Sequence, residues 1–212
     1  MSNKKLLILG ATGRTGQQLV TQALEAGHEV TAFARSADKI PVRHDRLHLV
    51  AGTVTGDGSM LAEAVRGQDA VISALGRGMS LKADSLIQRS VPAILSAMQT
   101  QRVRRLIFTS ALGVGDSIRD VPLFSRMVMR FLLRDIYADK VAGEELIRRS
   151  DLDWTLVQPP QLTNGPLTRS YRVGERLALR GMPRISRADV AHFILSQLDD
   201  TTYIRKAVVI GY

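Results

Sequence analysis

Three glycines near the start of the chain constrain its fold more than any other feature. Gly10, Gly13 and Gly16 are spaced three residues apart, between a short apolar segment, 4–9, and a segment with helical spacing, 15–26. Glycines in that context let the backbone turn sharply, approach a pyrophosphate closely and pack the helix against a strand. The free amides and the dipole at the helix start attract phosphates. The loop therefore predicts a dinucleotide site, and the alternative is a tight turn without a ligand.

The rest of the chain alternates strand-like and helical segments. Apolar, strand-like segments are expected at 29–34, 47–50, 70–75, 105–109, 154–157 and 207–210. Helical spacing is found at 59–66, 83–99, 123–134 and 138–149. Ser186 followed by Asp189 resembles a capping box that opens a last helix, which ends near Leu198. This alternation predicts an α/β fold of the Rossmann type, a doubly wound, mostly parallel sheet with helices on both faces.

The segment from Pro159 to Pro183 interrupts this alternation. It is rich in Pro, Gly, Asn and Arg, and one short hairpin is expected in it. No internal repeat, low-complexity tract or linker divides the sequence. We therefore expect residues 1–212 to form a single nucleotide-binding domain, with 159–185 as an irregular segment.

Arg35 follows the second expected strand and bears on which dinucleotide the loop favours. About 20 residues after such a loop, NAD-specific sites usually carry an acidic residue that binds the ribose hydroxyls. An arginine there instead can pair with a 2′-phosphate through two parallel hydrogen bonds. Arg14, inside the loop, is expected to reach the same phosphate. The sequence thus predicts NADP(H) as the cofactor, the alternative being two solvated surface arginines.

Composition excludes several other kinds of site. The chain has no cysteine, which excludes disulfides, thiolate catalysis and sulfur-ligated zinc. Its histidines show no metal-ligand spacing, so no metal is expected: His28, His44, His48 and His192. A formal charge of +9 suits anionic ligands, although an ordinary basic protein has it too. Aromatic residues make up only 5% and no basic run is interleaved with them, so nucleic acid is not an expected partner.

Hydropathy argues against a membrane protein. No apolar run approaches the roughly 20 residues that span a bilayer, and the first residues read as a strand, not as a secretory signal. We expect a cytoplasmic monomer or weak homodimer without stable membrane association. The segment 123–134 carries an apolar stripe and a basic face. That pattern fits a membrane-surface helix, but a helix that packs beside the site is preferred here.

Several motifs resemble the atypical short-chain dehydrogenases/reductases with NmrA-like folds. The spacing of the three glycines is typical of that group, and 70–76 is similar to its fourth strand and cofactor loop. Residues 108–111 are similar to its fifth strand, which ends in an active-site serine, and 151–160 to its sixth strand with a proline loop. The segments 165–168 and 184–193 are similar to the tail of biliverdin-IXβ reductases, which also reduce flavins. The resemblance covers nearly the whole chain.

The resemblance implies an NADPH-dependent oxidoreductase. Its acceptor would be a flat, electron-poor small molecule: a flavin, a linear tetrapyrrole such as biliverdin, or a quinone. Ser110 would lie near the nicotinamide, and Lys140 near the ribose hydroxyls or the substrate. Pro159 would pack against the nicotinamide, and residues 159–185 would lie on the substrate side. Standard members use Tyr-x-x-x-Lys, but Tyr137-Ala-Asp-Lys140 is one residue shorter. Tyr137 is therefore an open candidate for a general acid.

These arguments give a defined set of site residues. The expected cofactor contacts are Gly10, Thr12, Gly13, Arg14, Thr15, Gly16, Arg35, Thr53, Ala74, Leu75, Gly76, Ser110 and Pro159. The catalytic candidates are Ser110, Lys140 and Tyr137. Thr53 stands where the family often has an aspartate near the adenine. The alternative function is a non-catalytic NADP(H) sensor like the NmrA-type regulators. A sugar-nucleotide epimerase is disfavoured by the short chain and the incomplete Tyr-x-x-x-Lys.

Overall fold

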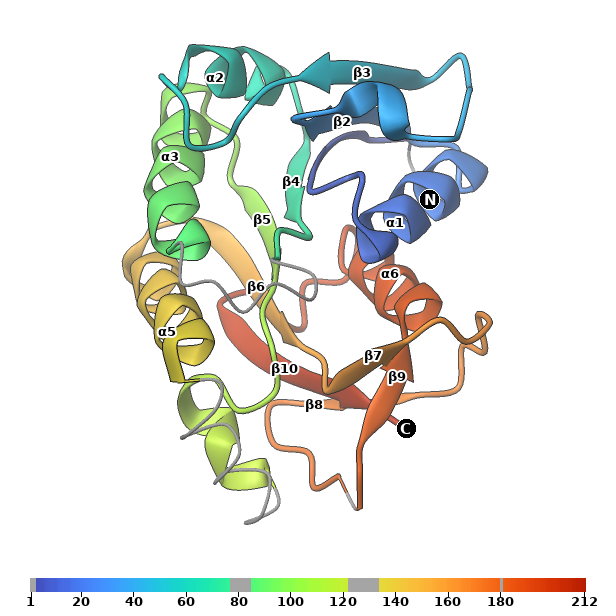
Figure 1. The fold of residues 1–212 in the computed structure, drawn as a ribbon, viewed down its shortest axis with the longest axis vertical. Helices are drawn as coiled ribbons and strands as arrows, with labels where there is room; N and C mark the ends of the chain where they lie inside the picture. Colours follow the sequence, from blue (N-terminus) through green and yellow to red (C-terminus); the bar gives the residue numbers. More distant parts are fainter. Residues whose placement is uncertain (1–2, 77–84, 122–133, 180) are drawn as a thin grey trace.

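One sheet runs through the whole molecule (Figure 1). The computed structural model describes residues 3–76, 85–121, 134–179 and 181–212. The strands of this sheet are β1 Lys5–Leu9, β2 Glu29–Ala34, β3 Leu47–Ala51, β4 Ala70–Ser73, β5 Arg105–Thr109, β6 Asp153–Gln158, β8 Arg172–Gly174 and β10 Lys206–Gly211. They lie in the order β3-β2-β1-β4-β5-β6-β10-β8, and only β8 runs antiparallel to its neighbour. A second, two-stranded parallel sheet joins β7 Gln161–Thr163 to β9 Arg184–Ser186.

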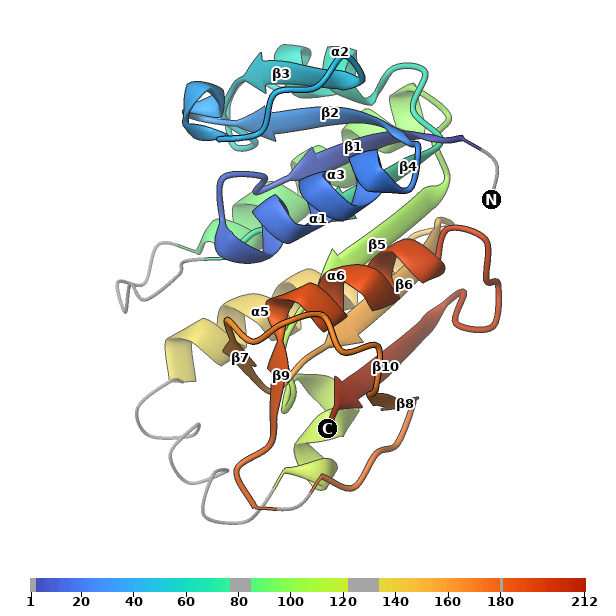
Figure 2. The same ribbon diagram turned by 90° about the vertical axis from the view of Figure 1, so that its right-hand side faces the viewer.

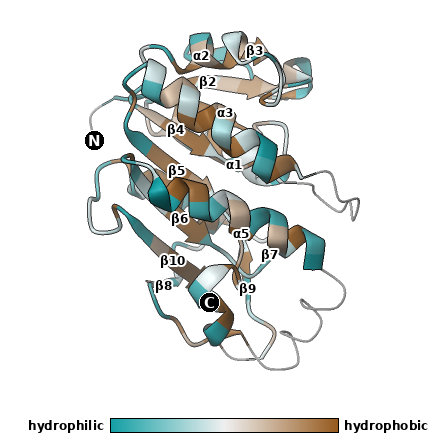
Figure 3. Cartoon of the chain, turned by 90° about the vertical axis from the view of Figure 1, so that its left-hand side faces the viewer, coloured by the Kyte–Doolittle hydropathy of each residue, from teal (hydrophilic) through white to brown (hydrophobic). Residues whose placement is uncertain are grey.

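Helices cover both faces of the large sheet. The α-helices are α1 Arg14–Glu25, α2 Ser59–Val65, α3 Leu86–Thr100, α5 Arg134–Arg149 and α6 Arg187–Ser196, and two short 3-10 helices are η1 Ala37–Lys39 and η2 Gly115–Asp120. Helices α1 and α6 lie side by side on one face (Figure 2). Helices α2, α3 and α5 cover the other (Figure 3). In the described part of the chain, no helix has the length and apolar character needed to cross a bilayer.

Strand β1 shows why the sheet must be covered on both sides. Successive side chains of a strand point to opposite faces. Leu6 and Ile8 accordingly pack with residues of α1 and α6, whereas Leu7 and Leu9 pack with residues of α2 and α3. All four side chains are fully buried. Such an unbroken apolar strand is stable only between two layers of helices, which are the outer layers seen here.

The expected α/β fold of the Rossmann type is confirmed, and most element bounds agree within a few residues. The helix expected at 123–134 lies, apart from Arg134, outside the described residues. The hairpin expected between Pro159 and Pro183 is wrong: β7 pairs with β9, and β8 pairs with β10. The backbone amides of Thr168 and Arg169 donate to the Asp189 carboxylate, at 2.9 and 2.7 Å. The chain between β7 and β8 is thereby bonded to the start of α6.

The start of α6 holds the expected cap. The Oγ of Ser186 accepts a hydrogen bond from the backbone amide of Asp189 at 3.0 Å. Asp189 is fully buried, and its carboxylate also accepts from the hydroxyl of Tyr212 at 2.6 Å. Burial alone would raise the pKa of Asp189, but the bonds from Tyr212, Arg169 and Thr168 outweigh it and lower that pKa. The ionised carboxylate therefore fixes the irregular segment to α6.

Candidate cofactor and active site

A cleft of about 490 Å³ lies at the carboxyl ends of the strands, where the connections from β1 and β4 diverge. Open α/β sheets bind ligands at such a switch point. Eight residues expected to contact the cofactor line the cleft: Gly10, Thr12, Gly13, Arg35, Thr53, Ala74, Leu75 and Gly76. Five others do not line it: Arg14, Thr15, Gly16, Ser110 and Pro159. The structure thus brings most of the expected set together, and their contact with a cofactor stays a prediction.

The three loop glycines differ in what would meet a side chain. A Cβ on Gly10, whose φ is +78°, would lie 2.7 Å from the carbonyl oxygen of Ala74. A Cβ on Gly16 would lie 2.2 Å from the carbonyl oxygen of Gly10. Gly13 has an ordinary φ of −71°, and its Cβ would meet only the Gly10 carbonyl oxygen, at 3.2 Å. Packing therefore requires Gly10 and Gly16, whereas Gly13 leaves open the side from which a ligand can approach.

The start of α1 suits a pyrophosphate. Gly13 is the N-cap residue of this helix and provides no side chain to bond its first amides. Free amides at a helix start, together with the helix dipole, favour an anion. The loop thus fits the group that a dinucleotide carries between its two nucleosides.

Two arginines line the same cleft. Arg35 follows β2, and Arg89 lies in the first turns of α3. None of the described residues that line the cleft is an aspartate or a glutamate. Our sequence analysis missed Arg89. The available signal was its position three residues after Leu86. Residues three apart in a helix share a face, and Leu86 also lines the cleft.

Two of the three catalytic candidates, Ser110 and Tyr137, lie around the ends of β5 and β6. The amide of Ser110 donates to the carbonyl of Val157, and the amide of Leu112 donates to the carbonyl of Pro159, both at 2.8 Å. The hydroxyl of Tyr137 donates to the carbonyl of Leu112 at 3.0 Å. Main-chain bonds therefore place Ser110 beside Pro159, with Tyr137 attached to the same loop. The Oγ of Ser110 is buried and has no hydrogen-bond partner in the described part of the chain.

Tyr137 is placed as a support for this loop. Burial raises the pKa of Tyr137 to about 12, whereas a catalytic Tyr-Lys pair needs a lowered tyrosine pKa. Its hydroxyl proton is engaged by the Leu112 carbonyl. Lys140 lies three residues further along α5 and is half-buried, near the same face of the helix.

Asp139, between those two residues, joins the helices that flank the site. It is 5% exposed, and its two carboxylate oxygens accept from the backbone amides of Ile87 and Gln88 at 3.1 and 2.9 Å. These amides belong to the first turn of α3, which has no side-chain cap of its own. Asp139 therefore caps α3 from α5, near the turn that carries Arg89. Sequence reasoning missed this role, because a cap from another helix leaves no local pattern.

Replacing Asp139 with alanine is expected to lower the free energy of unfolding by about 1–3 kcal/mol, because two amides at a buried helix start lose a charged acceptor. Urea denaturation measures this change. Asp45→Ala removes an exposed carboxylate and serves as the control, with an expected change within about 0.5 kcal/mol. Equal stability of the two variants would contradict the capping role.

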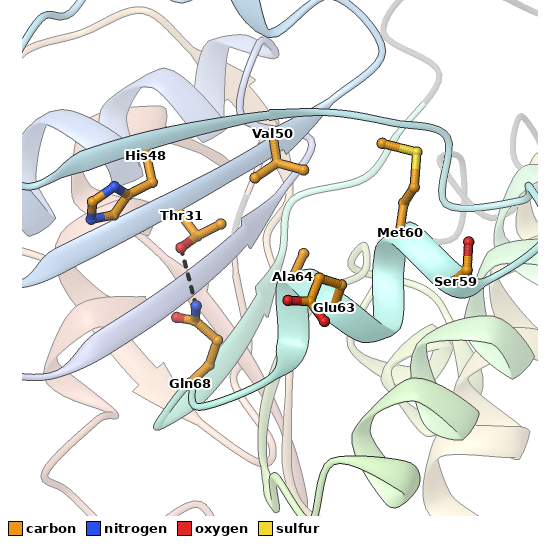
Figure 4. A pocket seen from close by; sticks show the side chains of 8 residues that line it. All are labelled: Thr31, His48, Val50, Ser59, Met60, Glu63, Ala64 and Gln68. Atoms are coloured by element: carbon orange, nitrogen blue, oxygen red, sulfur yellow. Dashed lines mark hydrogen bonds between the residues drawn. The ribbon is translucent and has the colours of Figure 1, made fainter.

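A second hollow of about 540 Å³ lies over β2, β3 and α2, away from the glycine loop (Figure 4). Helix α2 spans seven residues, so it leaves part of β3 uncovered. The side chains of Thr31 and Gln68 meet here through a hydrogen bond of 3.0 Å. The described lining contains no arginine, lysine or glycine. It therefore lacks the features that bind a dinucleotide.

Comparison with known proteins agrees with this geometry. Residues 10–201 match a family described as NAD(P)H-binding. The chain belongs to this NAD(P)H-binding family. It is 27% identical to the oxidoreductase aflX of Aspergillus parasiticus, over 94% of this chain and 80% of that protein. The family match confirms the expected NAD(P)H-binding family, and the protein is a member of an NAD(P)H-dependent oxidoreductase family.

Solved structures share its fold. A short-chain dehydrogenase/reductase from Veillonella parvula, in complex with NADP, superposes with a TM-score of 0.84 at 21% identity, over 100% of this chain and 95% of that one. ChuY, an anaerobillin reductase from Escherichia coli O157:H7, gives a TM-score of 0.79 at 22% identity, over 97% and 96%. At these identities the likeness concerns the fold alone.

Proposed function

We propose that this protein is an NADPH-dependent reductase that transfers a hydride to a flat, electron-poor acceptor, namely a flavin, a linear tetrapyrrole or a quinone. The observation that carries the proposal is the bond from the Tyr137 hydroxyl to the Leu112 carbonyl. It leaves the shortened Tyr-Lys pair without a free, activated acid. Carbonyl reduction needs such an acid, whereas an acceptor of this class can take its proton from solvent.

The chain's own residues bind and orient the reactants. Amides at the start of α1 would hold the pyrophosphate, and Arg35, which lines the cleft with Arg89, would bind the 2′-phosphate. Ala74, Leu75 and Gly76 line the cleft toward the ends of β4 and β5. NADPH, when bound, supplies the hydride.

The nicotinamide end is formed by the loops after β5 and β6. Pro159 would shield one side of the nicotinamide ring from water. The Oγ of Ser110, which has no partner among the described residues, would donate a hydrogen bond that positions the substrate or the cofactor. Lys140 would bind the ribose hydroxyls or the substrate. The names of two similar proteins, an oxidoreductase and an anaerobillin reductase, support a reductase in this role.

The experiment that tests this function is NADPH oxidation by the purified protein with FMN, biliverdins and menadione as acceptors. Turnover with at least one of them is expected. Tight NADPH binding without turnover of any acceptor would contradict the proposal and would favour a sensor of NADP(H).

Tyr137→Phe is expected to keep kcat within about threefold of the wild-type value. Only a bond to a main-chain carbonyl is lost, at a cost of about 1 kcal/mol in stability. Because burial raises the pKa of Tyr137 to about 12, this residue stays protonated from pH 6 to pH 9 and should leave no inflection in the kcat profile. Steady-state kinetics across this pH range give both results. A loss of about 100-fold or more, typical of a missing general acid, would show that Tyr137 protonates the substrate.

A further inference from the structure

A buried glutamate lies beside the last residue of β6. Glu144 belongs to α5, which packs on β6 (Figure 3), and it is only 2% exposed. Its Oε1 accepts a hydrogen bond of 2.8 Å from the side-chain amide of Gln158, the equally buried residue that ends β6. Burying a carboxylate costs free energy unless charged or hydrogen-bonding partners offset the loss of water.

Arg148 balances the charge of this carboxylate. Its Nη2 donates to Oε2 of Glu144 at 3.2 Å, and its guanidinium carbon lies 5.6 Å from the centre of the Trp154 ring. Trp154 is a buried residue of β6. The ion pair is therefore attached to β6 by a cation–π contact, and Oε1 of Glu144 is left to bind Gln158.

The side-chain amide of Gln158 also bonds to the loop after β5. Its Nε2 donates a second hydrogen bond, of 3.1 Å, to the carbonyl of Val114. A carboxylate in an ion pair only accepts hydrogen bonds, so Glu144 binds the NH₂ end of this amide and fixes which end faces Val114. If the amide turned by half a rotation, its oxygen would face the Val114 carbonyl and the bond would be lost.

Val114 belongs to a short loop that begins at Ser110. The Ser117 hydroxyl donates to the carbonyl of Val114 and accepts from the amide of Gly113, both at 2.9 Å. The amide of Val114 donates to the carbonyl of Ala111 at 3.2 Å. Because these bonds join residues 111–117 into one unit, a shift of Val114 is passed on to Ser110.

We propose that Glu144 is a positioning residue of the active site. Acting through Gln158, it sets where the loop from Ser110 to Val114 lies relative to Pro159. This inference rests on the proposed reductase function, in which the nicotinamide lies beside Ser110 and Pro159. Glu144 does not touch the reactants in this role, but a shift of about 1 Å at the reacting groups can slow a reaction by about 100-fold.

The cofactor phosphates should not depend on this glutamate. In the proposed function they bind at the start of α1 and after β2, on elements that contact neither Glu144 nor Gln158 through any of these bonds. A positioning role therefore lowers kcat and leaves the affinity for NADP⁺ nearly unchanged. A general loss of structure would lower both.

Glu144→Gln keeps the size of the side chain and removes its charge, so that the Gln158 amide is free to turn. In the unliganded variant, hydrogen exchange of the backbone amides of Ser110 and Leu112 is expected to become about tenfold faster, measured by NMR. NADPH oxidation is measured with whichever of FMN, biliverdin or menadione the wild-type protein reduces. There kcat is expected to fall about tenfold or more, while the dissociation constant for NADP⁺ changes by no more than about threefold.

Glu145→Gln is the matched control. Glu145 forms the same kind of ion pair on the same helix, with Arg149 at 3.9 Å, but its side chain is 59% exposed. Removing this charge should leave amide exchange, kcat and NADP⁺ affinity unchanged. Equal effects of Glu144→Gln and Glu145→Gln would contradict a role that depends on the buried pair.

Gln158→Met tests whether Glu144 acts through Gln158. It replaces the amide with an apolar side chain of similar length, removes both hydrogen bonds and should give the same pattern as Glu144→Gln. In the Gln158→Met background, Glu144→Gln should lower kcat no further, because the two residues act through one bond. Effects that multiply in the double variant would show that Glu144 acts by another route.

The outcomes separate this inference from the proposed function. Unchanged exchange of the Ser110 and Leu112 amides, or a lower stability in urea with unchanged kcat, would overturn the positioning role while the reductase function stands. An NADP⁺ affinity that falls as much as kcat would also overturn it. If amide exchange responds as expected but the wild-type protein reduces no acceptor, Glu144 still positions the loop and the reductase function fails.

Discussion

Replacing Arg35 with glutamate should cost the protein about 100-fold or more of its affinity for NADP⁺. The variant loses a charge-assisted pair with the 2′-phosphate and places a carboxylate beside that phosphate. NAD⁺ lacks the phosphate, so its affinity should change by no more than about threefold. Because the cleft lining described here contains no other carboxylate, the new charge acts without a competing one. Calorimetric titration of both cofactors measures the ratio.

Two further variants make this result specific. Arg35→Gln removes attraction without adding repulsion and should give an intermediate loss. If Arg35→Gln still prefers NADP⁺, the preference should fall further in the double variant with Arg89→Gln, because Arg89 lines the same cleft. An NADP⁺-to-NAD⁺ ratio that is unchanged in Arg35→Glu would remove Arg35 from the cofactor site.

The features that could be predicted from the sequence are those recorded by local patterns. The four buried residues of β1, Leu6 to Leu9, read as an unbroken apolar run, and Gly10 and Gly16 mark a turn that tolerates no side chain. Regular alternation of strands and helices then allows few arrangements other than a parallel sheet. The position of the cleft follows from the same order of strands and helices, since the cleft lies where the connections from β1 and β4 diverge.

The features that could not be predicted depend on contacts between distant segments. β7 pairs with β9, more than twenty residues away, because Asp189 binds the intervening backbone near Thr168. Asp139 caps a helix that begins about fifty residues earlier in the chain. Such side chains look like ordinary polar residues in the sequence, and only the packing of α3 against α5 gives them a role. Arg89 is an intermediate case. The sequence predicted its helix, but not which face of that helix lines the cleft.

Gly13→Val should abolish nucleotide binding while the protein still folds. The three loop glycines are alike in the sequence, but the Cβ at Gly13 would meet one carbonyl oxygen at 3.2 Å, a contact that a small shift relieves. We expect a stability loss of about 1 kcal/mol. The valine side chain, however, would occupy the open side of the loop, where the pyrophosphate must reach the amides of α1. Loss of two such charged hydrogen bonds weakens binding by about 100-fold or more.

Two control variants separate the effect on binding from the effect on folding. Gly56→Val creates a similar contact, 3.1 Å from the Thr53 carbonyl oxygen, at a residue that does not line the cleft, and should keep nucleotide affinity. Gly16→Ala places its Cβ 2.2 Å from the Gly10 carbonyl oxygen and should lose the fold itself. Thermal unfolding and calorimetric titration of all three variants measure both quantities. A folded Gly13→Val protein that binds NADP⁺ with wild-type affinity would show that the pyrophosphate does not lie on this loop, and the cofactor would then have to enter the cleft from another side.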